Sequence, residues 1–164
     1  MATEPGESVE QRLNRNFEDL LQELRVSQNG TQILFAFLLT VPFSSGFHKV
    51  TTFERGFYFT ALLLSALSAA LLIAPAVMHR VLFRHDQKAG LVLAASRLAL
   101  GGQTLLLFAV SASVFLVGDY LYGHMVGAIT AVGVTVWTAV WFFALPLWMR
   151  LRHGHRAADS TSST

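Results

Sequence analysis

The chain contains no cysteine and few charged residues. The absence of cysteine among the 164 residues excludes disulfides, thiolate catalysis and cysteine-ligated metals. Charged residues make up only 13% of the chain, well below the roughly 25% found in soluble domains. These charges fall in short stretches separated by long apolar runs. This layout is typical of a multi-pass membrane protein.

Signatures of catalysis and of cofactor binding are also missing. No nucleotide-binding loop, nucleophile motif or metalloprotease motif occurs, so we expect neither an enzyme nor a cofactor. The closely spaced His153 and His155 have no obvious third ligand nearby, and no metal site is predicted. Because the basic residues border the apolar runs, we interpret them as topology signals and expect no nucleic-acid partner.

Residues 8–28 predict an amphipathic helix that follows a disordered N-terminus over residues 1–7. Its apolar residues recur three or four positions apart, at Val9, Leu13, Phe17, Leu20, Leu21 and Leu24. Six acids against three arginines across residues 1–28 make the segment a poor anchor for anionic lipid. We expect the apolar face to pack on a transmembrane bundle or on a partner protein. The alternative is a helix that lies at the cytoplasmic surface of the membrane.

Four apolar runs follow, and they predict an all-α, four-helix transmembrane bundle over residues 29–149. The runs cover about residues 29–47, 56–78, 89–118 and 123–149. A helix needs about 20 residues to cross the hydrocarbon core, and the first run is the weakest because Pro42 and Gly46 interrupt it. A basic, then Ser/Thr-rich tail over residues 150–164 is expected to be disordered.

The distribution of lysine and arginine predicts the orientation of these spans. Ten of the twelve lie in the N-terminal segment, the 79–97 connection and the tail, and two lie in the 48–55 loop. The positive-inside rule therefore places the N-terminus and the C-terminus in the cytoplasm. We expect a multi-pass protein of the cell membrane, with the lipid bilayer as its first partner.

Small residues recur in these runs at a spacing that permits close packing of helices. Gly123, Gly127 and Ala131 lie four residues apart in the fourth run, and Gly101 belongs to a similar ladder in the third. Such ladders allow two backbones to approach closely inside lipid. We expect tight helix packing here, either within one chain or between copies in a homo-oligomer.

Arg97 is the charged residue that lies deepest in an apolar run. Eight uncharged residues precede it and twenty-one follow it. One interpretation makes Arg97 the inner border of the third span. The other makes it a functional charge in an intramembrane polar site with Gln103 and Thr104. The second interpretation depends on the helical face that Arg97 shares with Gly101 and Thr104, which we expect to point toward another helix.

A second polar cluster is predicted at the outer ends of the spans. His48, Glu54 and Arg55 follow the first run, and Asp119 and His124 flank the short connection before the fourth. Two histidines beside two carboxylates could bind a cation or respond to pH. The alternative is that all five are solvated loop residues. Asp119 by itself is expected to cap or end the third helix.

Three stretches resemble a family of small bacterial integral membrane proteins of unknown function: NRNFEDLLQELRVSQNGTQILFAFLLTVPF, FERGFYF and APAVMHRVLFRHDQKAGLVLAASRLALGG. The resemblance covers roughly residues 10–120. Members are sometimes labelled sodium:proton antiporters, so it implies four spans, a cytoplasmic amphipathic helix and movement of a cation or proton. It brings no established catalytic residue.

Two functions are therefore expected. The first is a transporter-like role in cation or proton movement, which the family resemblance implies. The second is a non-transporting accessory or scaffold role, in which residues 8–26 bind a cytoplasmic protein partner. The lack of an acidic residue deep in any span favours the second role.

Overall fold

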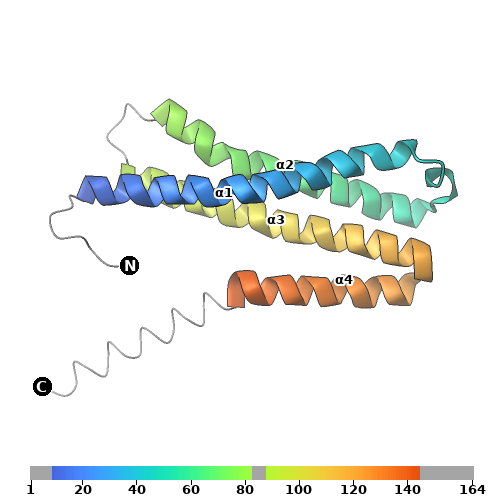
Figure 1. Ribbon diagram of the computed structural model, residues 1–164. Coiled ribbons are helices and arrows are strands. Elements are labelled where there is room, and N and C mark those ends of the chain that lie inside the picture. The colour runs from blue at the N-terminus through green and yellow to red at the C-terminus, as the bar shows by residue number, and fades with distance from the viewer. Residues whose placement is uncertain (1–8, 83–87, 145–164) are drawn as a thin grey trace, which may run out of the picture.

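The computed structural model is a bundle of four helices (Figure 1). It describes residues 9–82 and 88–144, and no strand occurs in those two ranges. The predicted all-α class is therefore confirmed. The long helices are α1 (Val9–Thr40), α2 (Thr52–Leu82), α3 (Lys88–Tyr122) and α4 (His124–Ala139). The short elements are 3-10 turns over Val41–Phe43 and Phe47–Lys49 and a π-helical turn over Val140–Ala144.

The N-terminal part of the chain forms one helix where two segments were expected. The sequence analysis divided an amphipathic helix from a first span at residue 29, but α1 continues through this position to Thr40. Gly30 does not end the helix, since an interior glycine costs only about 1 kcal/mol relative to alanine. The helix ends before Pro42, which enters a 3-10 turn. Proline has no amide hydrogen to extend the helical hydrogen bonds.

Three segments among the described residues are apolar and long enough to cross a membrane. They are Thr52–Met78, Leu93–Tyr122 and His124–Phe142, and they coincide with the second, third and fourth predicted spans. The first predicted span is not among them, because its continuous apolar part runs only from Ile33 to Phe43. Eleven helical residues rise about 16 Å, against a hydrocarbon core about 30 Å thick. The predicted N-terminus, the tail and residues 145–149 lie outside the described residues.

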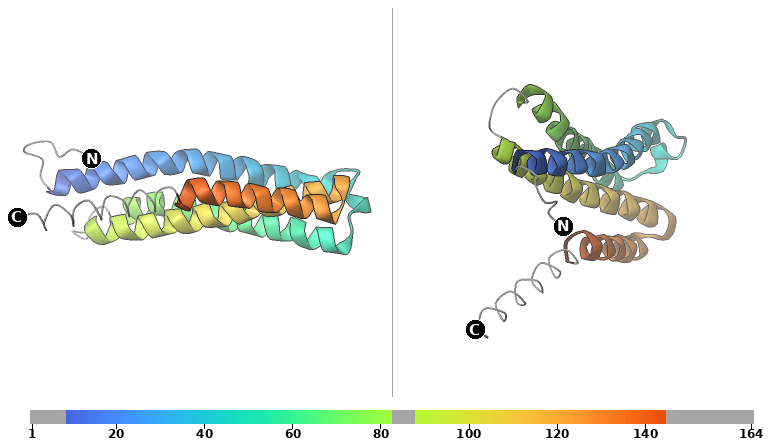
Figure 2. Two further views of the ribbon diagram at one scale, coloured as in Figure 1. Left: turned by 90° about the horizontal axis from the view of Figure 1, so that it is seen from below. Right: turned by 60° about the vertical axis from the view of Figure 1, so that its left-hand side comes forward.

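The helices pack around a central antiparallel pair formed by α2 and α3, which share the most extensive contact. Helix α1 packs mainly on α2 and less on α3. Helix α4 packs along α3 and reaches α2 through its first residue, His124, whose ring contacts that of Phe53. It lies at the edge of the bundle (Figures 1 and 2). We call the end that holds residues 41–51 and Gly123 the loop end.

Two small apolar clusters form the buried core along α2. Both use alanines of α3, which let the backbones of α2 and α3 approach closely. The cluster at the loop end contains Leu38, Tyr58, Ala61 and Ala112, and the cluster farther along the bundle contains Leu24, Leu72 and Ala99.

Polar side chains also connect both neighbouring helices to α2. The Tyr58 hydroxyl donates to the Leu38 carbonyl of α1 at 2.9 Å, and the Ser68 hydroxyl donates to the Gly102 carbonyl of α3 at 2.7 Å. The Gln28 amide of α1 donates to a carbonyl of α2 at 2.6 Å, one turn before the buried Pro75. Hydrogen bonds between helices hold polar groups that lipid cannot satisfy.

Candidate functional site

The turn between α3 and α4 brings Asp119 and His124 together. Helix α3 ends at Tyr122, and Gly123 follows with a φ of 90°, a conformation that side chains other than glycine's rarely adopt. The Gly123 amide donates to the Asp119 carbonyl at 2.8 Å. This geometry places the His124 Nδ1 atom in hydrogen-bond contact with the Asp119 carboxylate. Asp119 thus lies in the last turn of α3, and the helix ends three residues after it.

Asp119 is a buried carboxylate, and among the described residues only one of its two oxygen atoms has a hydrogen-bond partner. Its side chain is 4% exposed, whereas the side chain of its partner His124 is 71% exposed. Within the described part of the chain, the Asp119 Oδ2 atom is buried and has no hydrogen-bond partner. An unpaired buried polar group costs about 1–3 kcal/mol, and more if it is charged. The burial contradicts the alternative of a solvated loop residue.

Glu54 reaches the same region from the first turn of α2. It is 7% exposed, and the ring centroid of its neighbour Phe53 lies 5.1 Å from that of His124. Its Oε2 atom accepts from the Thr51 amide at 2.7 Å, and its own amide donates to the Thr51 hydroxyl at 3.2 Å. These reciprocal bonds form a capping box. The sequence analysis missed this role, although the spacing Thr-x-x-Glu signals it.

Two phenylalanine rings lie beside His124, whose side chain remains exposed. The His124 ring centroid lies 5.1 Å from that of Phe53 and 6.4 Å from that of Phe115. Phe57 stacks on Phe115 with centroids 4.3 Å apart. These phenylalanines come from α2 and α3, so they join the loop-end residues of three helices. Sequence spacing gave no signal for this contact, because it depends on how the helices are aligned.

The other two members of the predicted outer cluster lie elsewhere at the loop end. The Arg55 guanidinium lies over the ring of Phe47, 5.8 Å from its centroid, and His48 is exposed. The structure thus joins Asp119 to His124 and places Glu54 at the same end of the bundle, but it does not gather all five residues. In the ranges that the structure describes, no group of three or more His, Cys, Asp or Glu side chains could hold a metal ion.

The predicted intramembrane polar site does not form a shared buried face. Arg97 is exposed, Gln103 is partly buried, and the Thr104 hydroxyl donates to the Leu100 carbonyl of its own helix at 2.8 Å. The buried stripe of α3 instead contains Ala95, Ala99, Gly102, Ala109 and Ala112. Arg97 itself is thus exposed, whereas Gly101 on the same predicted face contacts a leucine of α2. Ala99, Ala112 and Gly102 pack against α2, because small residues permit a closer approach than an arginine does.

The small residues of α4 pack against α3 of the same chain. A Cβ atom at Gly127 would lie 2.8 Å from the Asp119 backbone nitrogen, and one at Gly118 would lie 2.8 Å from the Gly127 Cα atom. One turn beyond Ala131, the Thr135 hydroxyl donates to the Ser111 hydroxyl at 2.6 Å. In the third span, Gly101 contacts a leucine of α2. Gly127 and Gly101 thus pack within one chain, whereas a Cβ atom at Gly123 would meet nothing within 4 Å among the described residues.

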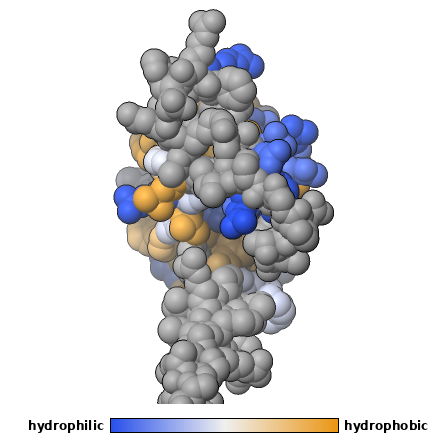
Figure 3. All heavy atoms as spheres, turned by 90° about the vertical axis from the view of Figure 1, so that its left-hand side faces the viewer, coloured by the Kyte–Doolittle hydropathy of each residue, from blue (hydrophilic) through white to orange (hydrophobic). Residues whose placement is uncertain are grey.

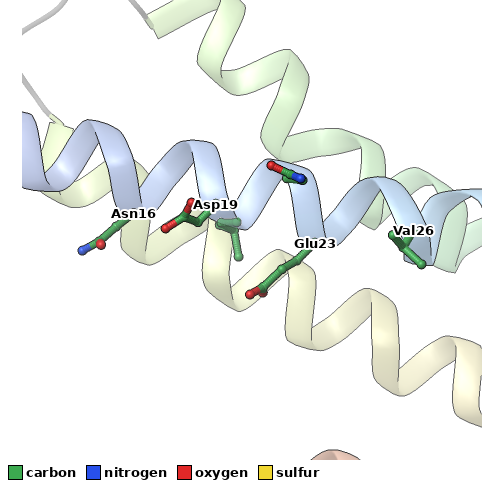
Figure 4. A pocket seen from close by; sticks show the side chains of 6 residues that line it. Asn16, Asp19, Glu23 and Val26 are labelled. Carbon is green, nitrogen blue, oxygen red and sulfur yellow. The ribbon is translucent and has the colours of Figure 1, made fainter. Parts of the chain in front are cut away.

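The first half of α1 combines a buried apolar face with an exposed polar one. Phe17 and Leu24 are buried, and the second of them belongs to the core cluster with α2 and α3. Beside them, an open groove of about 630 Å³ is lined by Asn16, Asp19, Leu20, Gln22, Glu23 and Val26. Figure 4 shows Asn16, Asp19 and Glu23 along one side of α1. Hydrophilic side chains also appear at this end of the bundle in Figure 3.

The comparison with known proteins identifies the chain at the level of a family. A family of unknown function, DUF6328, matches residues 6–146. No curated protein and no solved structure matches the chain. The matched segment contains all four helices and the loop-end site, so it extends beyond the stretches that carried the resemblance in the sequence. The chain therefore belongs to DUF6328, a family of unknown function.

Proposed function

We propose that this protein is a non-enzymatic accessory or scaffold protein of the cell membrane, which binds a cytoplasmic protein through the polar face of α1. The observation that carries this proposal is the continuity of α1. One helix of 32 residues packs its apolar face on the bundle and also presents the acidic groove. A partner bound there would contact a surface attached rigidly to the membrane domain.

The packing of α1 favours protein binding over insertion into lipid. Phe17 and Leu24, the apolar residues that a surface-lying helix would place in lipid, are already buried inside the chain. The exposed residues of the groove include Asp19 and Glu23. Anionic headgroups repel such carboxylates. The groove therefore fits a partner segment that carries lysine or arginine on one face.

The predicted topology places this groove on the side where such a partner would be found. Ten of the twelve lysines and arginines lie in residues 1–28, residues 79–97 and the tail. The positive-inside rule then assigns the start of α1 and both termini to the cytoplasm.

Site-specific photo-crosslinking in intact cells tests the proposal. A photoreactive residue is placed at Asp19, at Glu23 or, as the control, at Glu18, which is exposed but does not line the groove. We expect discrete adducts with one protein from the two groove positions and none from the control. The double variant D19K/E23K should abolish a cross-link formed from Val26, whereas E18K should not. Equal labelling from all positions, or no adduct, would overturn the proposal.

Surface substitutions are preferable to deletion of residues 8–26. A deletion would remove the buried side chains of Phe17 and Leu24 and so destabilise the bundle. The circular dichroism spectrum and membrane insertion of the double variant should match those of the wild type, because only exposed side chains change.

Transport of protons or cations is the second candidate function. The buried Asp119 carboxylate, one oxygen of which has no hydrogen-bond partner among the described residues, favours it. An ionisable residue inside a membrane segment is a functional-site hypothesis by default. However, both carboxylates of the spans, Glu54 and Asp119, belong to the loop end, and Asp119 lies 22 residues, or about 33 Å, from Arg97 along α3. In liposomes that contain the purified protein, a sodium pulse should change the internal pH if the protein transports, and D119N should abolish the change. A response equal to that of empty liposomes would reject transport.

A further inference from the structure

Two apolar grooves run along the outer half of α3 on either side of one stripe of residues. The stripe consists of Ser113, Val117 and Leu121, which lie four residues apart and line both grooves. The groove of about 460 Å³ lies along the side of the stripe that faces α4 and is also lined by Leu34 of α1, and we call it the α4 groove. The groove of about 270 Å³ lies between the stripe and residues 41–50, and we call it the loop groove.

Hydroxyl groups in the α4 groove do not make it polar. The Ser113 hydroxyl donates to the Ala109 carbonyl, and the Thr130 hydroxyl donates to the Val126 carbonyl, both at 2.8 Å. The walls therefore present hydrocarbon surface. The α4 groove is open to the side because α1 and α4 make no contact with each other among the described residues.

The length of the α4 groove matches one leaflet of a bilayer. Its lining on α3 runs from Val110 to Tyr122, which is about 18 Å along the helix. Half of a hydrocarbon core of about 30 Å is about 15 Å. A fatty acyl chain that begins at the loop end would fill the α4 groove along its length.

The accessible charge at the loop end is positive. Lys49 is exposed beside Phe47 and Val50, which line the loop groove, and Arg55 is exposed with its guanidinium over the Phe47 ring. The two acids of this end, Glu54 and Asp119, are buried. An anionic group at the mouth of the loop groove would meet two cations and no exposed carboxylate.

We infer that one anionic diacyl phospholipid binds at the loop end, with an acyl chain in each groove and its phosphate beside Lys49 and Arg55. The stripe separates the two acyl chains, and the positive charges of Lys49 and Arg55 select an anionic headgroup. This site lies at the opposite end of α1 from the acidic groove and is independent of the proposed protein partner.

Native mass spectrometry of the full-length protein in neutral detergent tests this inference. The protein is titrated with dioleoyl phosphatidylglycerol or dioleoyl phosphatidylcholine, and the bound lipids are counted. We expect one retained phosphatidylglycerol, bound about 25-fold more tightly than phosphatidylcholine, since each basic residue contributes about fivefold. The variant K49Q/R55Q should bring the two lipids to near-equal retention. R97Q, which removes a cation from an exposed position outside both grooves, should leave the preference unchanged.

A second pair of variants tests the grooves themselves. V117W places an indole on the stripe and should reduce retention of both lipids at least tenfold. V132W is the matched control, because Val132 has a similar exposure of 62% against 57% for Val117 but lines neither groove. Equal retention of the two lipids by the wild type would overturn the inference, as would equal losses in V117W and V132W. Helical content measured on every variant separates loss of binding from loss of fold.

Discussion

Adding a single methyl group at Gly127 should loosen the attachment of α4. A Cβ atom at this position would lie 2.8 Å from the Asp119 nitrogen and 2.9 Å from the Phe115 carbonyl oxygen. Ordinary contacts begin at 3.4 Å, so α3 and α4 must separate by roughly half an ångström. Both neighbouring atoms belong to the backbone and cannot rotate away. Overpacking of this kind costs about 1–3 kcal/mol.

A matched glycine on the same helix separates this effect from helix propensity. A Cβ atom at Gly133 would meet nothing within 4 Å, so G133A should gain the usual advantage of alanine over glycine, about 0.5–1 kcal/mol. In G127A the same gain opposes the steric cost, which leaves a net loss of up to about 2.5 kcal/mol. The two substitutions are chemically identical, yet they are expected to change stability in opposite directions.

The assay is reversible unfolding of the full-length protein in mixed micelles as the mole fraction of dodecyl sulfate increases. Helical content gives the global transition, and the fluorescence of Trp137 and Trp141, whose rings lie 6.0 Å apart, reports on the α4 region. We expect the fluorescence transition of G127A to occur at a lower denaturant fraction than that of G133A. If G127A is as stable as G133A, the close contact between α3 and α4 is refuted.

Three further substitutions test the hydrogen bonds that join the helices. Y58F removes the buried hydroxyl that bonds α1 at 2.9 Å, and it should cost about 0.5–1.5 kcal/mol of unfolding free energy in the same assay. S68A removes the 2.7 Å bond to the Gly102 carbonyl of α3, and it should cost about 0.6 kcal/mol, the average for hydrogen bonds between membrane helices. H124A leaves the buried Asp119 carboxylate without its hydrogen-bond partner, and it should cost about 1–3 kcal/mol.

Matched controls distinguish these bonds from general effects of substitution. Y122F removes the hydroxyl of a tyrosine that is 74% exposed, and T104V removes a hydroxyl that bonds only its own helix. Both should change stability by less than 0.5 kcal/mol, the usual range for surface changes. For His124, the double variant H124A/D119N should recover part of the loss, because it removes the unpaired buried charge. Equal losses in a test variant and its control would show that the cross-helix bond contributes nothing.

For the loop-end site, the sequence predicted which residues lie at that end of the helices but not how they are buried or which of them touch. His48, Glu54, Arg55, Asp119 and His124 were grouped from their positions beside the predicted turns, and the structure joins only Asp119 and His124 by a hydrogen bond among the residues that it describes. The burial of Glu54 and Asp119 was not predictable, because it depends on how the helices pack against one another. The capping box at Thr51 is a local pattern that the sequence contains, and it was overlooked.

The sequence by itself determined the all-α class and the three long apolar helices. These properties depend on the length and composition of each run, since a helix crosses a membrane if about 20 successive residues are apolar. The first predicted span continued to residue 47, whereas α1 ends at Thr40, because the proline at position 42 cannot extend the helical hydrogen bonds. The sequence did not reveal that the amphipathic segment and the first apolar run form one helix.

The tertiary structure alone decided which side of each helix is buried. Successive residues in a helix are rotated by about 100°, so the stripe of Arg97 and the stripe of Ala95 and Ala99 are adjacent and equally periodic. Only the close approach of α2 selects the alanines and leaves Arg97 exposed. Likewise, Gly127 lies against Gly118 because of the way α3 and α4 are aligned. Alignment between helices is a property of packing in three dimensions, and the spacing of residues along one helix does not encode it.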